Sequence, residues 1–286
     1  MPVEVNGKSI KNPIGLGAGI DKDGFLAPPW IARAGIGFIT IGSITLKPRP
    51  GNPKPRIVKY PGLKAMVNAM GLPSRGGFTD FVSRLPGILS KLRRLGTYVI
   101  ISLAGFSIGE FMYMLNGLRG GYGVDAVELN ISSPTYRGSW ITDREYLGEL
   151  LRSVEAFPGV LFIKLPLGVD IEFYRWVVNV AEKRGFGLTI ANTLPIKEPG
   201  ISVGYGGLSG YPIHPIVKSL IVKVRRWGGF RNPIIGLGGV FHGRQVVDLL
   251  RNGADMVGVV TAFAYEGPFV FNRLFKEVLM GLSERL

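Results

Sequence analysis

The chain has 286 residues and a formal net charge of +14, from 34 Lys and Arg against 20 Asp and Glu. It contains no cysteine, which excludes disulfides, thiolate metal sites and a cysteine nucleophile. No apolar run reaches the ~18 residues of a membrane span, and the N-terminus lacks the layout of a signal peptide, so we expect a cytoplasmic protein with no membrane span.

The first residues predict a small β-hairpin. Val3–Val5 and Lys8–Ile10 flank Asn6 and Gly7, a pair that is typical of a two-residue hairpin turn. We expect this ribbon to cap the bottom of the fold that follows.

After the hairpin, short apolar runs alternate with amphipathic segments, which is the rhythm of βα units. The predicted strands are Ile14–Gly17, Phe38–Ile41, Tyr98–Ser102, Ala126–Asn130, Val160–Lys164, Leu188–Asn192, Pro233–Gly236 and Met256–Val260. Helices are expected near residues 28–34, 77–94, 107–118, 143–156, 170–184, 213–226, 242–252 and 267–283. Eight such pairs predict the α/β class and a (β/α)8 TIM barrel, as a single domain over residues 1–286. A doubly wound open sheet is the alternative.

Two connections are too long for simple turns, and we predict them to be loop insertions on the top face of the barrel. The first covers residues 42–76 and is rich in Pro, Lys and Arg, and the second covers residues 193–212 and is rich in Gly. Long ordered loops in this position usually build the functional site.

Polar side chains close several predicted strands, at the end of the barrel where this fold keeps its chemistry. Asn130 ends one strand and is followed by Ser133 in a Ser-Ser-Pro loop, Lys164 ends the next strand, and Asn192 ends the one after. With Asn68 from the first insertion, the three amides indicate a clamp for a flat heterocycle or a carboxylate. A lysine that ends an apolar strand indicates an anionic partner, with a lysine that snorkels at the barrel rim as the alternative.

Glycines at two strand exits predict a phosphate site. Gly238 and Gly239 follow the seventh strand, and the eighth strand ends near Val260 and Thr261. Bare backbone N–H groups and a short helix N-terminus form the common phosphate site of barrels in this position. We therefore expect a phosphorylated ligand or cofactor.

The first strand runs into the stretch Gly17–Gly24, which begins Gly-Ala-Gly. Its bare backbone would let a planar cofactor lie close, and Lys22 would add positive charge. Asp21 and Asp23 are interpreted as caps of the next helix.

The two histidines are predicted to be structural or exposed. His214 and His242 each precede a helical stretch without a carboxylate at a telling spacing, and no cluster with metal-ligand spacing is present, so no metal site is predicted. The basic clusters Lys91–Arg94 and Lys223–Arg226 are typical of solvated helix faces, so we expect no nucleic-acid partner despite the net charge.

Together these features resemble the dihydroorotate dehydrogenase family, whose members are FMN-containing TIM barrels of pyrimidine biosynthesis. The resemblance covers nearly the whole chain. It depends on motifs that follow one another at strand ends: Asn12–Gly24, Gly51–Arg56, Asn68–Leu72, Asn130–Pro134, Ile163–Leu165, Ala191–Thr193, Gly206–Gly210, Gly236–Val240 and Tyr265–Pro268.

The resemblance implies an FMN-dependent oxidoreductase that oxidises dihydroorotate to orotate. Ser133 would be the base that removes a proton from the substrate ring while a hydride passes to the flavin N5. The implied substrate contacts are Asn68, Met70, Gly71, Leu72, Asn130, Asn192 and Thr193. The implied FMN contacts are Ala18, Gly19, Lys22, Ser43, Asn130, Lys164, Gly210, Gly238, Gly239, Val260 and Thr261, with the Gly pair at the phosphate.

Features of two classes of the family are mixed in this chain. The serine base, Lys22 and the motif Gly51–Arg56 resemble the membrane-linked class, but its N-terminal helical extension is not expected, because the chain starts almost at the barrel. Asn68–Leu72 and Ser102–Phe106 resemble the soluble class. We expect a soluble, serine-using homodimer, with fumarate, quinone, oxygen, or NAD through an electron-transfer subunit as open choices of electron acceptor.

The chain departs from the family pattern at two clamp positions. Thr135 and Ser74 stand where the family usually has Asn. We hypothesise that Arg137, in the same loop as Thr135, binds the substrate carboxylate, and that Tyr136 relays the proton of Ser133 through water.

Two other functions stay open at this stage. One is a related flavin reductase that acts on another pyrimidine or on uridine in tRNA, which the positive charge favours. The other is a non-catalytic FMN-binding subunit that scaffolds a partner, which the change at Thr135 permits. The presence of Ser133 and three clamp amides argues against the second.

Overall fold

A closed barrel of eight parallel strands forms the centre of the computed structural model, which describes residues 2–25, 33–133, 139–154, 157–227 and 229–283. The barrel strands, in the order in which they pair, are β3 (Ile14–Leu16), β4 (Phe38–Thr45), β7 (Tyr98–Ala104), β8 (Ala126–Asn130), β9 (Val160–Lys164), β10 (Gly187–Ile190), β13 (Ile234–Leu237) and β14 (Met256–Val259). The predicted (β/α)8 TIM barrel is therefore confirmed, and the open sheet is excluded because β14 pairs with β3.

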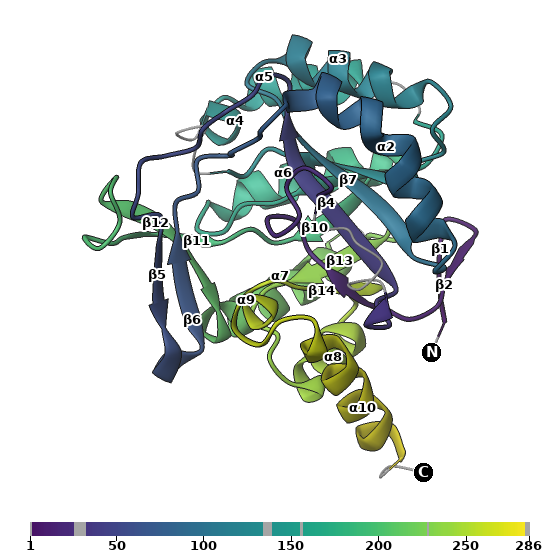
Figure 1. The fold of residues 1–286 in the computed structure, drawn as a ribbon, viewed down its shortest axis with the longest axis vertical. Helices are drawn as coiled ribbons and strands as arrows, with labels where there is room; N and C mark the ends of the chain where they lie inside the picture. The colour runs from purple at the N-terminus through teal and green to yellow at the C-terminus, as the bar shows by residue number, and fades with distance from the viewer. Residues whose placement is uncertain (1, 26–32, 134–138, 155–156, 228, 284–286) are drawn as a thin grey trace.

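Helices lie around the barrel (Figure 1). They are α2 (Gly77–Arg93), α3 (Ile108–Arg119), α4 (Ser139–Thr142), α5 (Arg144–Ser153), α6 (Ile171–Arg184), α7 (His214–Arg226), α8 (Gly243–Arg251), α9 (Thr261–Glu266) and α10 (Phe269–Ser283), with short 3-10 turns η1 (Pro61–Leu63) and η3 (Tyr211–Ile213). Ser107, Asp143 and Asp170 each accept a hydrogen bond from a backbone N–H in the first turn of the helix that follows, which sets where α3, α5 and α6 begin. Most of the helix predicted near 28–34 lies outside the described residues.

The lower half of the barrel interior is apolar, and the N-terminal hairpin closes it. Strands β1 (Val3–Val5) and β2 (Lys8–Ile10) pair antiparallel around Asn6 and Gly7, both with positive φ. Val5 and Ile10 pack in one buried cluster with Phe38, Phe162 and Met256 from the amino ends of the barrel strands. The hairpin thus caps the barrel as the sequence predicts.

The two long connections are insertions on the top face of the barrel, as predicted, but the strands within them were not predicted. They contain β5 (Ile57–Tyr60) and β6 (Ala65–Asn68) from the first connection and β11 (Leu194–Lys197) and β12 (Tyr205–Gly210) from the second. The four strands form one antiparallel sheet in the order β11-β12-β6-β5. In Figure 1 this sheet lies at the opposite end of the barrel from the β1–β2 hairpin.

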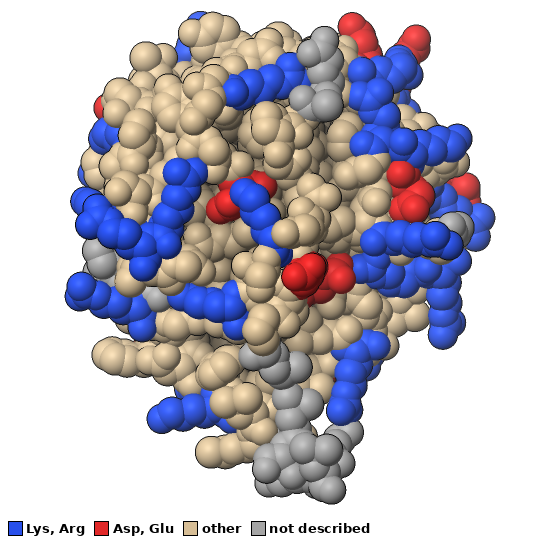
Figure 2. All heavy atoms as spheres, turned by 90° about the vertical axis from the view of Figure 1, so that its right-hand side faces the viewer, with Lys and Arg blue, Asp and Glu red and all other residues tan. Residues whose placement is uncertain are grey.

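The Lys and Arg residues do not gather in one patch on the face drawn in Figure 2, where they alternate with uncharged surface and a few Asp and Glu. Within the described ranges, no helix is both long enough and apolar enough to cross a membrane.

Candidate active site

A cavity of about 590 Å³ lies between the carboxyl ends of the barrel strands and the four-stranded sheet. Its walls include every site residue predicted from the sequence: Ala18, Gly19, Lys22, Ser43, Asn68, Met70, Gly71, Leu72, Asn130, Ser133, Lys164, Asn192, Thr193, Gly210, Gly238, Gly239, Val260 and Thr261. The fold therefore brings together residues that are spread over most of the chain.

The glycine loop after β13 has the shape expected of a phosphate cradle. Gly238 and Gly239 have φ values of 149° and 73°, which residues other than glycine rarely adopt. A Cβ on Gly239 would lie 2.6 Å from the Cβ of His214, so the tight packing behind the loop also requires glycine. Next to this loop, Thr261 Oγ1 donates a hydrogen bond to Ser209 Oγ at 3.0 Å.

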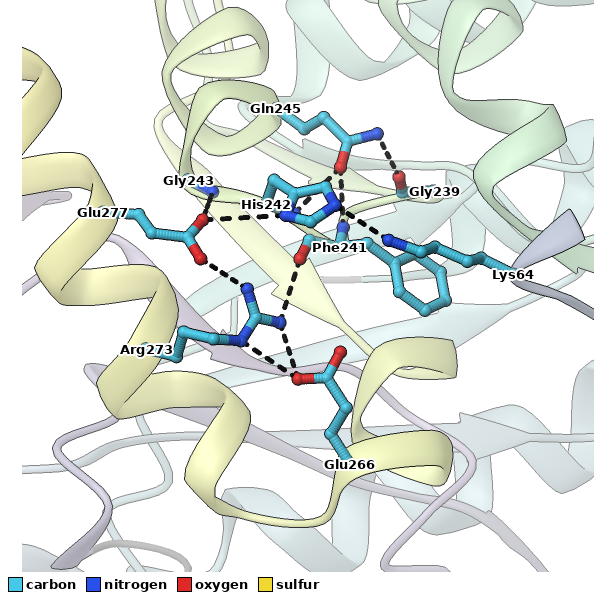
Figure 3. A network of polar contacts seen from close by, with 9 residues as sticks. All are labelled: Lys64, Gly239, Phe241, His242, Gly243, Gln245, Glu266, Arg273 and Glu277. Atoms are coloured by element: carbon cyan, nitrogen blue, oxygen red, sulfur yellow. Dashed lines mark hydrogen bonds and ion pairs between the residues drawn. The ribbon is translucent and has the colours of Figure 1, made fainter. Parts of the chain in front are cut away.

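A polar network behind the glycine loop holds it in place (Figure 3). Gln245 donates to the Gly239 carbonyl at 2.7 Å and accepts from the backbone N–H of His242 at 2.9 Å. His242 Nε2 lies 2.9 Å from Lys64 Nζ, at the tip of the β5–β6 hairpin. The network thus links the four-stranded sheet to the start of α8 beneath the glycine loop.

Neither histidine lines the cavity, and each has a carboxylate nearby that the sequence spacing did not reveal. His214 Nε2 lies 3.0 Å from Asp248 Oδ2, and His242 Nδ1 lies 3.9 Å from Glu277 Oε2. These carboxylates come from α8 and α10, so only the fold brings them close. The described part of the chain has no group of three or more metal-ligating side chains.

The basic side chains that line the cavity are Lys22, Arg49, Lys59 and Lys164. The pKa of Lys22 is lowered to about 8, chiefly by burial and then by the nearby cations Lys164 and Arg56, while Asp23 opposes the shift. Lys164 is only 4% exposed, and its Nζ lies 3.8 Å from Glu128 Oε1. An anion beside Lys22 would stabilise its ammonium form.

The predicted amide clamp is assembled around a short hydrogen-bonded loop. Asn130 Nδ2 donates to Ser43 Oγ at 2.7 Å, and Asn192 Nδ2 donates to Ser132 Oγ at 3.0 Å. Asn68 reaches the same cavity from β6, where its Nδ2 lies 3.5 Å from the Gly207 carbonyl. Ser133, which is 8% exposed, lines the cavity beside them.

Asp23 and Ser74 connect two loops beside the cavity. Asp23 does not act as a helix cap in the described residues: it accepts hydrogen bonds from Ser74 Oγ at 3.0 Å and from the backbone N–H of Arg75 at 3.3 Å. Ser74 is therefore turned toward Asp23, and the two side chains tie the loop after β3 to the loop after β6. The hypotheses for Thr135, Tyr136 and Arg137 concern a segment that lies outside the described residues.

Sequence reasoning missed several residues of the site. Arg49 lines the cavity and stacks over the ring of Phe106, with 4.4 Å between Cζ and the ring centroid. Tyr205 and Ile57 line its outer part from the four-stranded sheet, which the sequence did not predict. The sequence predicts Glu128 only as part of the strand Ala126–Asn130. Strand alternation places its side chain on the same face as Asn130, and a charged residue at such an inward-facing position is a signal of a functional or polar site.

Comparison with known proteins gives a consistent assignment. A model of the family described as dihydroorotate dehydrogenase matches residues 1–282. A dihydroorotate dehydrogenase (quinone) of Myxococcus xanthus is 34% identical, over 94% of this chain and 76% of that protein. One of Cellvibrio japonicus is 33% identical, over 93% of this chain and 82% of that protein. The crystal structure of the Eimeria tenella enzyme in complex with ferulenol superposes with a TM-score of 0.85 at 26% identity, covering 99% of this chain and 85% of that one.

Proposed function

The chain belongs to the dihydroorotate dehydrogenase family, and we propose that the cavity at the top of the barrel is where it oxidises dihydroorotate to orotate. The reaction belongs to pyrimidine biosynthesis, and the enzyme is an oxidoreductase that depends on FMN. The residue roles that follow are part of the proposal.

The cavity fits FMN on two observations. The Gly238–Gly239 turn leaves no room for side chains and presents bare backbone, which suits the phosphate. Lys22 lines the same cavity, and an anion beside it would stabilise its charged form, whose pKa is lowered by burial. We assign the cofactor contacts to Ala18, Gly19, Lys22, Ser43, Asn130, Lys164, Gly210, Gly238, Gly239, Val260 and Thr261. FMN supplies the acceptor for the hydride that leaves the substrate.

The substrate is oriented by the side-chain amides and by the backbone of the first insertion, residues 42–76. Asn68, Asn130 and Asn192 supply donors and acceptors for a ring that carries carbonyl, N–H and carboxylate groups. Met70, Gly71, Leu72 and Thr193 complete this wall. The four-stranded sheet contributes Ile57, Met66 and Tyr205 to the wall of the cavity and so limits the access of bulk water to the reacting carbons.

Ser133 takes the proton from the ring carbon of the substrate, and the hydride leaves the adjacent carbon. A serine hydroxyl is a weak base, so it depends on close positioning in a buried site, and Ser133 is 8% exposed. The single observation that carries the proposal is that Ser133, three clamp amides and Lys164 meet in one cavity.

Replacement of the base tests the assignment. Ser133→Ala should slow the anaerobic bleaching of the flavin band by dihydroorotate by about 10²–10⁴-fold, while FMN content and orotate binding stay close to those of the unchanged protein. Ser83→Ala, on the exposed face of α2, is the matched control and should leave the rate unchanged. An unchanged bleaching rate in Ser133→Ala would remove Ser133 from the mechanism.

For the electron acceptor we propose a quinone. The curated relatives that match the chain are named for this acceptor, and the wall of the cavity includes the side chains of Ile20, Ile57, Val203 and Tyr205, beside Arg49 and Lys59. Anaerobically reduced protein mixed with a water-soluble quinone, fumarate or NAD should be reoxidised at least tenfold faster by the quinone. Faster reoxidation by fumarate would assign a different acceptor.

The homodimer expected from the resemblance is part of the proposal too. Light scattering at micromolar concentration should give about twice the mass of one 31.1 kDa chain. The mass of a single chain would contradict it.

A further inference from the structure

Glu128 is a buried carboxylate for which the proposed chemistry has no role. It lies on β8 between Ala126 and Asn130, and the alternation of a strand points all three side chains into the barrel. Ala126 belongs to the apolar layer below, and Asn130 lines the cavity above. Glu128, which is 1% exposed, thus sits one layer beneath the substrate clamp.

Three neighbours on three strands surround this carboxylate. Ser102 Oγ on β7 donates to Oε1 at 2.8 Å, and Thr189 Oγ1 on β10 donates to Oε2 at 2.8 Å. Lys164 Nζ on β9 lies 3.8 Å from Oε1. A carboxylate accepts hydrogen bonds and donates none, so both hydroxyls must give it their hydrogens.

The donation from Ser102 to Glu128 fixes the direction of the hydrogen bonds that link Ser102, Ser43 and Asn130. Ser102 has a single hydroxyl hydrogen, which goes to Glu128, so Ser43 must be the donor in the 2.9 Å contact between Ser43 Oγ and Ser102 Oγ. Ser43 Oγ in turn accepts from Asn130 Nδ2 at 2.7 Å. The nitrogen of the Asn130 amide is therefore held on the Ser43 side.

The other half of the same amide continues the chain. Asn130 Oδ1 accepts from Ser132 Oγ at 3.1 Å, and Ser132 Oγ accepts from Asn192 Nδ2 at 3.0 Å. Each donor from Asn192 to Ser102 consequently points toward Glu128. We call this series Asn192–Ser132–Asn130–Ser43–Ser102–Glu128 the donor chain.

We propose that Glu128 is a positioning residue for the substrate: as the final acceptor of the donor chain, it holds the Ser43 hydroxyl as an acceptor for the Asn130 amide, whose Oδ1 also accepts from the backbone N–H of Ser132 at 3.3 Å. The Asn192 amide is oriented by backbone groups, because its Nδ2 donates to the Ser132 carbonyl at 3.0 Å and its Oδ1 accepts from the Thr193 N–H at 2.9 Å. The Lys164 ammonium beside Oε1 reinforces the acceptor role of Glu128, because it keeps an oxygen at the position that Ser102 must face. An amide that can flip presents the wrong atom to a ligand half of the time, so the fixed direction favours ligands whose donors and acceptors match it. The inference depends on the proposed function, since it assigns the clamp to orotate and dihydroorotate.

The test compares orotate dissociation constants, measured from the shift of the flavin spectrum in the FMN-loaded protein. Ser102→Ala cuts the donor chain without touching the ligand and should weaken orotate binding by about 5- to 20-fold, which corresponds to one lost oriented hydrogen bond. Thr189→Val removes the other donor to Glu128, which is not on the path to the clamp, and should change the constant less than twofold. Both variants lose one buried hydroxyl, so a merely structural role would affect them equally.

Variants of Glu128 itself complete the design. Glu128→Gln can still offer an amide oxygen to Ser102, so it should retain orotate binding within about threefold, whereas Glu128→Leu should lose as much as Ser102→Ala. FMN dissociation constants, measured by fluorescence, should change by a smaller factor than the orotate constants in Ser102→Ala, because only Ser43 and Asn130 among the assigned FMN contacts belong to the donor chain. Equal orotate affinity in Ser102→Ala and the unchanged protein would overturn the inference, whereas failure of the unchanged protein to bind orotate would overturn the proposed function.

Discussion

Two layers of side chains inside the same barrel have opposite chemistry. The lower layer contains Phe38, Phe162 and Met256 with the plug from the hairpin, and all are apolar and buried. The upper layer, two residues further along the strands, contains Ser102, Glu128, Thr189 and Lys164, which are buried as deeply. In both layers, strand alternation decides which residues point inward. The position of a residue along its strand therefore decides whether its side chain packs in the apolar core or faces the cavity.

The difference has an energetic meaning. The lower layer stabilises the barrel through removal of apolar area from water. The upper layer must place two charges in the barrel interior, and desolvation of such a pair largely offsets its attraction. We therefore expect the lower layer to determine stability alone, and the upper layer to affect stability and ligand binding together.

The largest effect is expected at Lys164. Lys164→Met leaves the Glu128 carboxylate buried without its ammonium, which should cost about 3–5 kcal/mol of unfolding free energy and weaken FMN binding at least tenfold. Urea denaturation of the cofactor-free protein and FMN fluorescence measure the two effects. Lys197→Met, at an exposed position of β11, is the control and should stay within about 0.5 kcal/mol.

The lower layer gives the contrasting case. Phe162→Ala removes a ring that is fully buried and should destabilise the protein by about 3–4 kcal/mol. Among molecules that remain folded, the orotate dissociation constant should stay within twofold. A large loss of orotate affinity with little loss of stability in Phe162→Ala would show that the lower layer affects ligand binding, which contradicts the proposed difference between the layers.

Lys22 connects stability to pH. Its folded pKa of about 8 lies below the ordinary 10.5, so the unfolded chain binds more protons between these values. The charged form therefore destabilises the cofactor-free protein below pH 8, by up to about 3 kcal/mol, and this penalty disappears as the pH rises toward 10.5.

Lys22→Met should thus stabilise the cofactor-free protein at pH 7, and the gain should shrink as the pH rises to 10. The same variant should bind FMN at least tenfold more weakly, because it lacks the cation. Urea denaturation of both proteins at four pH values checks the first effect, and a gain that does not depend on pH would show that Lys22 is not the titrating group.

The smallest effect is expected at the hairpin plug. Ile10→Val removes one methylene from the base of the lower layer and should cost about 1 kcal/mol. FMN and orotate affinities should not change, because the hairpin lies at the opposite end of the barrel from the four-stranded sheet (Figure 1), whose residues line the cavity. A shift in either affinity would mean that the base and the top of the barrel are coupled.

Much of the fold and the site could be predicted from local patterns. The strands Ala126–Asn130 and Val160–Lys164 have the predicted bounds, because apolar runs end in polar residues where the chain leaves the barrel. Strand β10, in contrast, ends at Ile190, two residues before the predicted end at Asn192. All the predicted site residues line one cavity, since parallel strands bring their carboxyl ends to one edge.

What could not be predicted depends on contacts between distant segments. The four-stranded sheet requires Asn68 to pair with Gly207, and neither segment alone has the pattern of a sheet. The partners of Glu128 come from three other strands, so its role in orienting Asn130 follows only from their arrangement in space. The stacking of Arg49 on Phe106 likewise brings together two loops that are far apart in the sequence, so it could not be predicted from local patterns.

The most direct test of the account is an anaerobic titration of the purified, FMN-loaded protein with dihydroorotate, followed through the visible flavin band. We predict that the band bleaches with one equivalent of substrate per flavin and that orotate is formed in equal amount. A band that shifts or stays unchanged without bleaching, in protein that binds FMN, would contradict the assignment of this cavity to dihydroorotate oxidation.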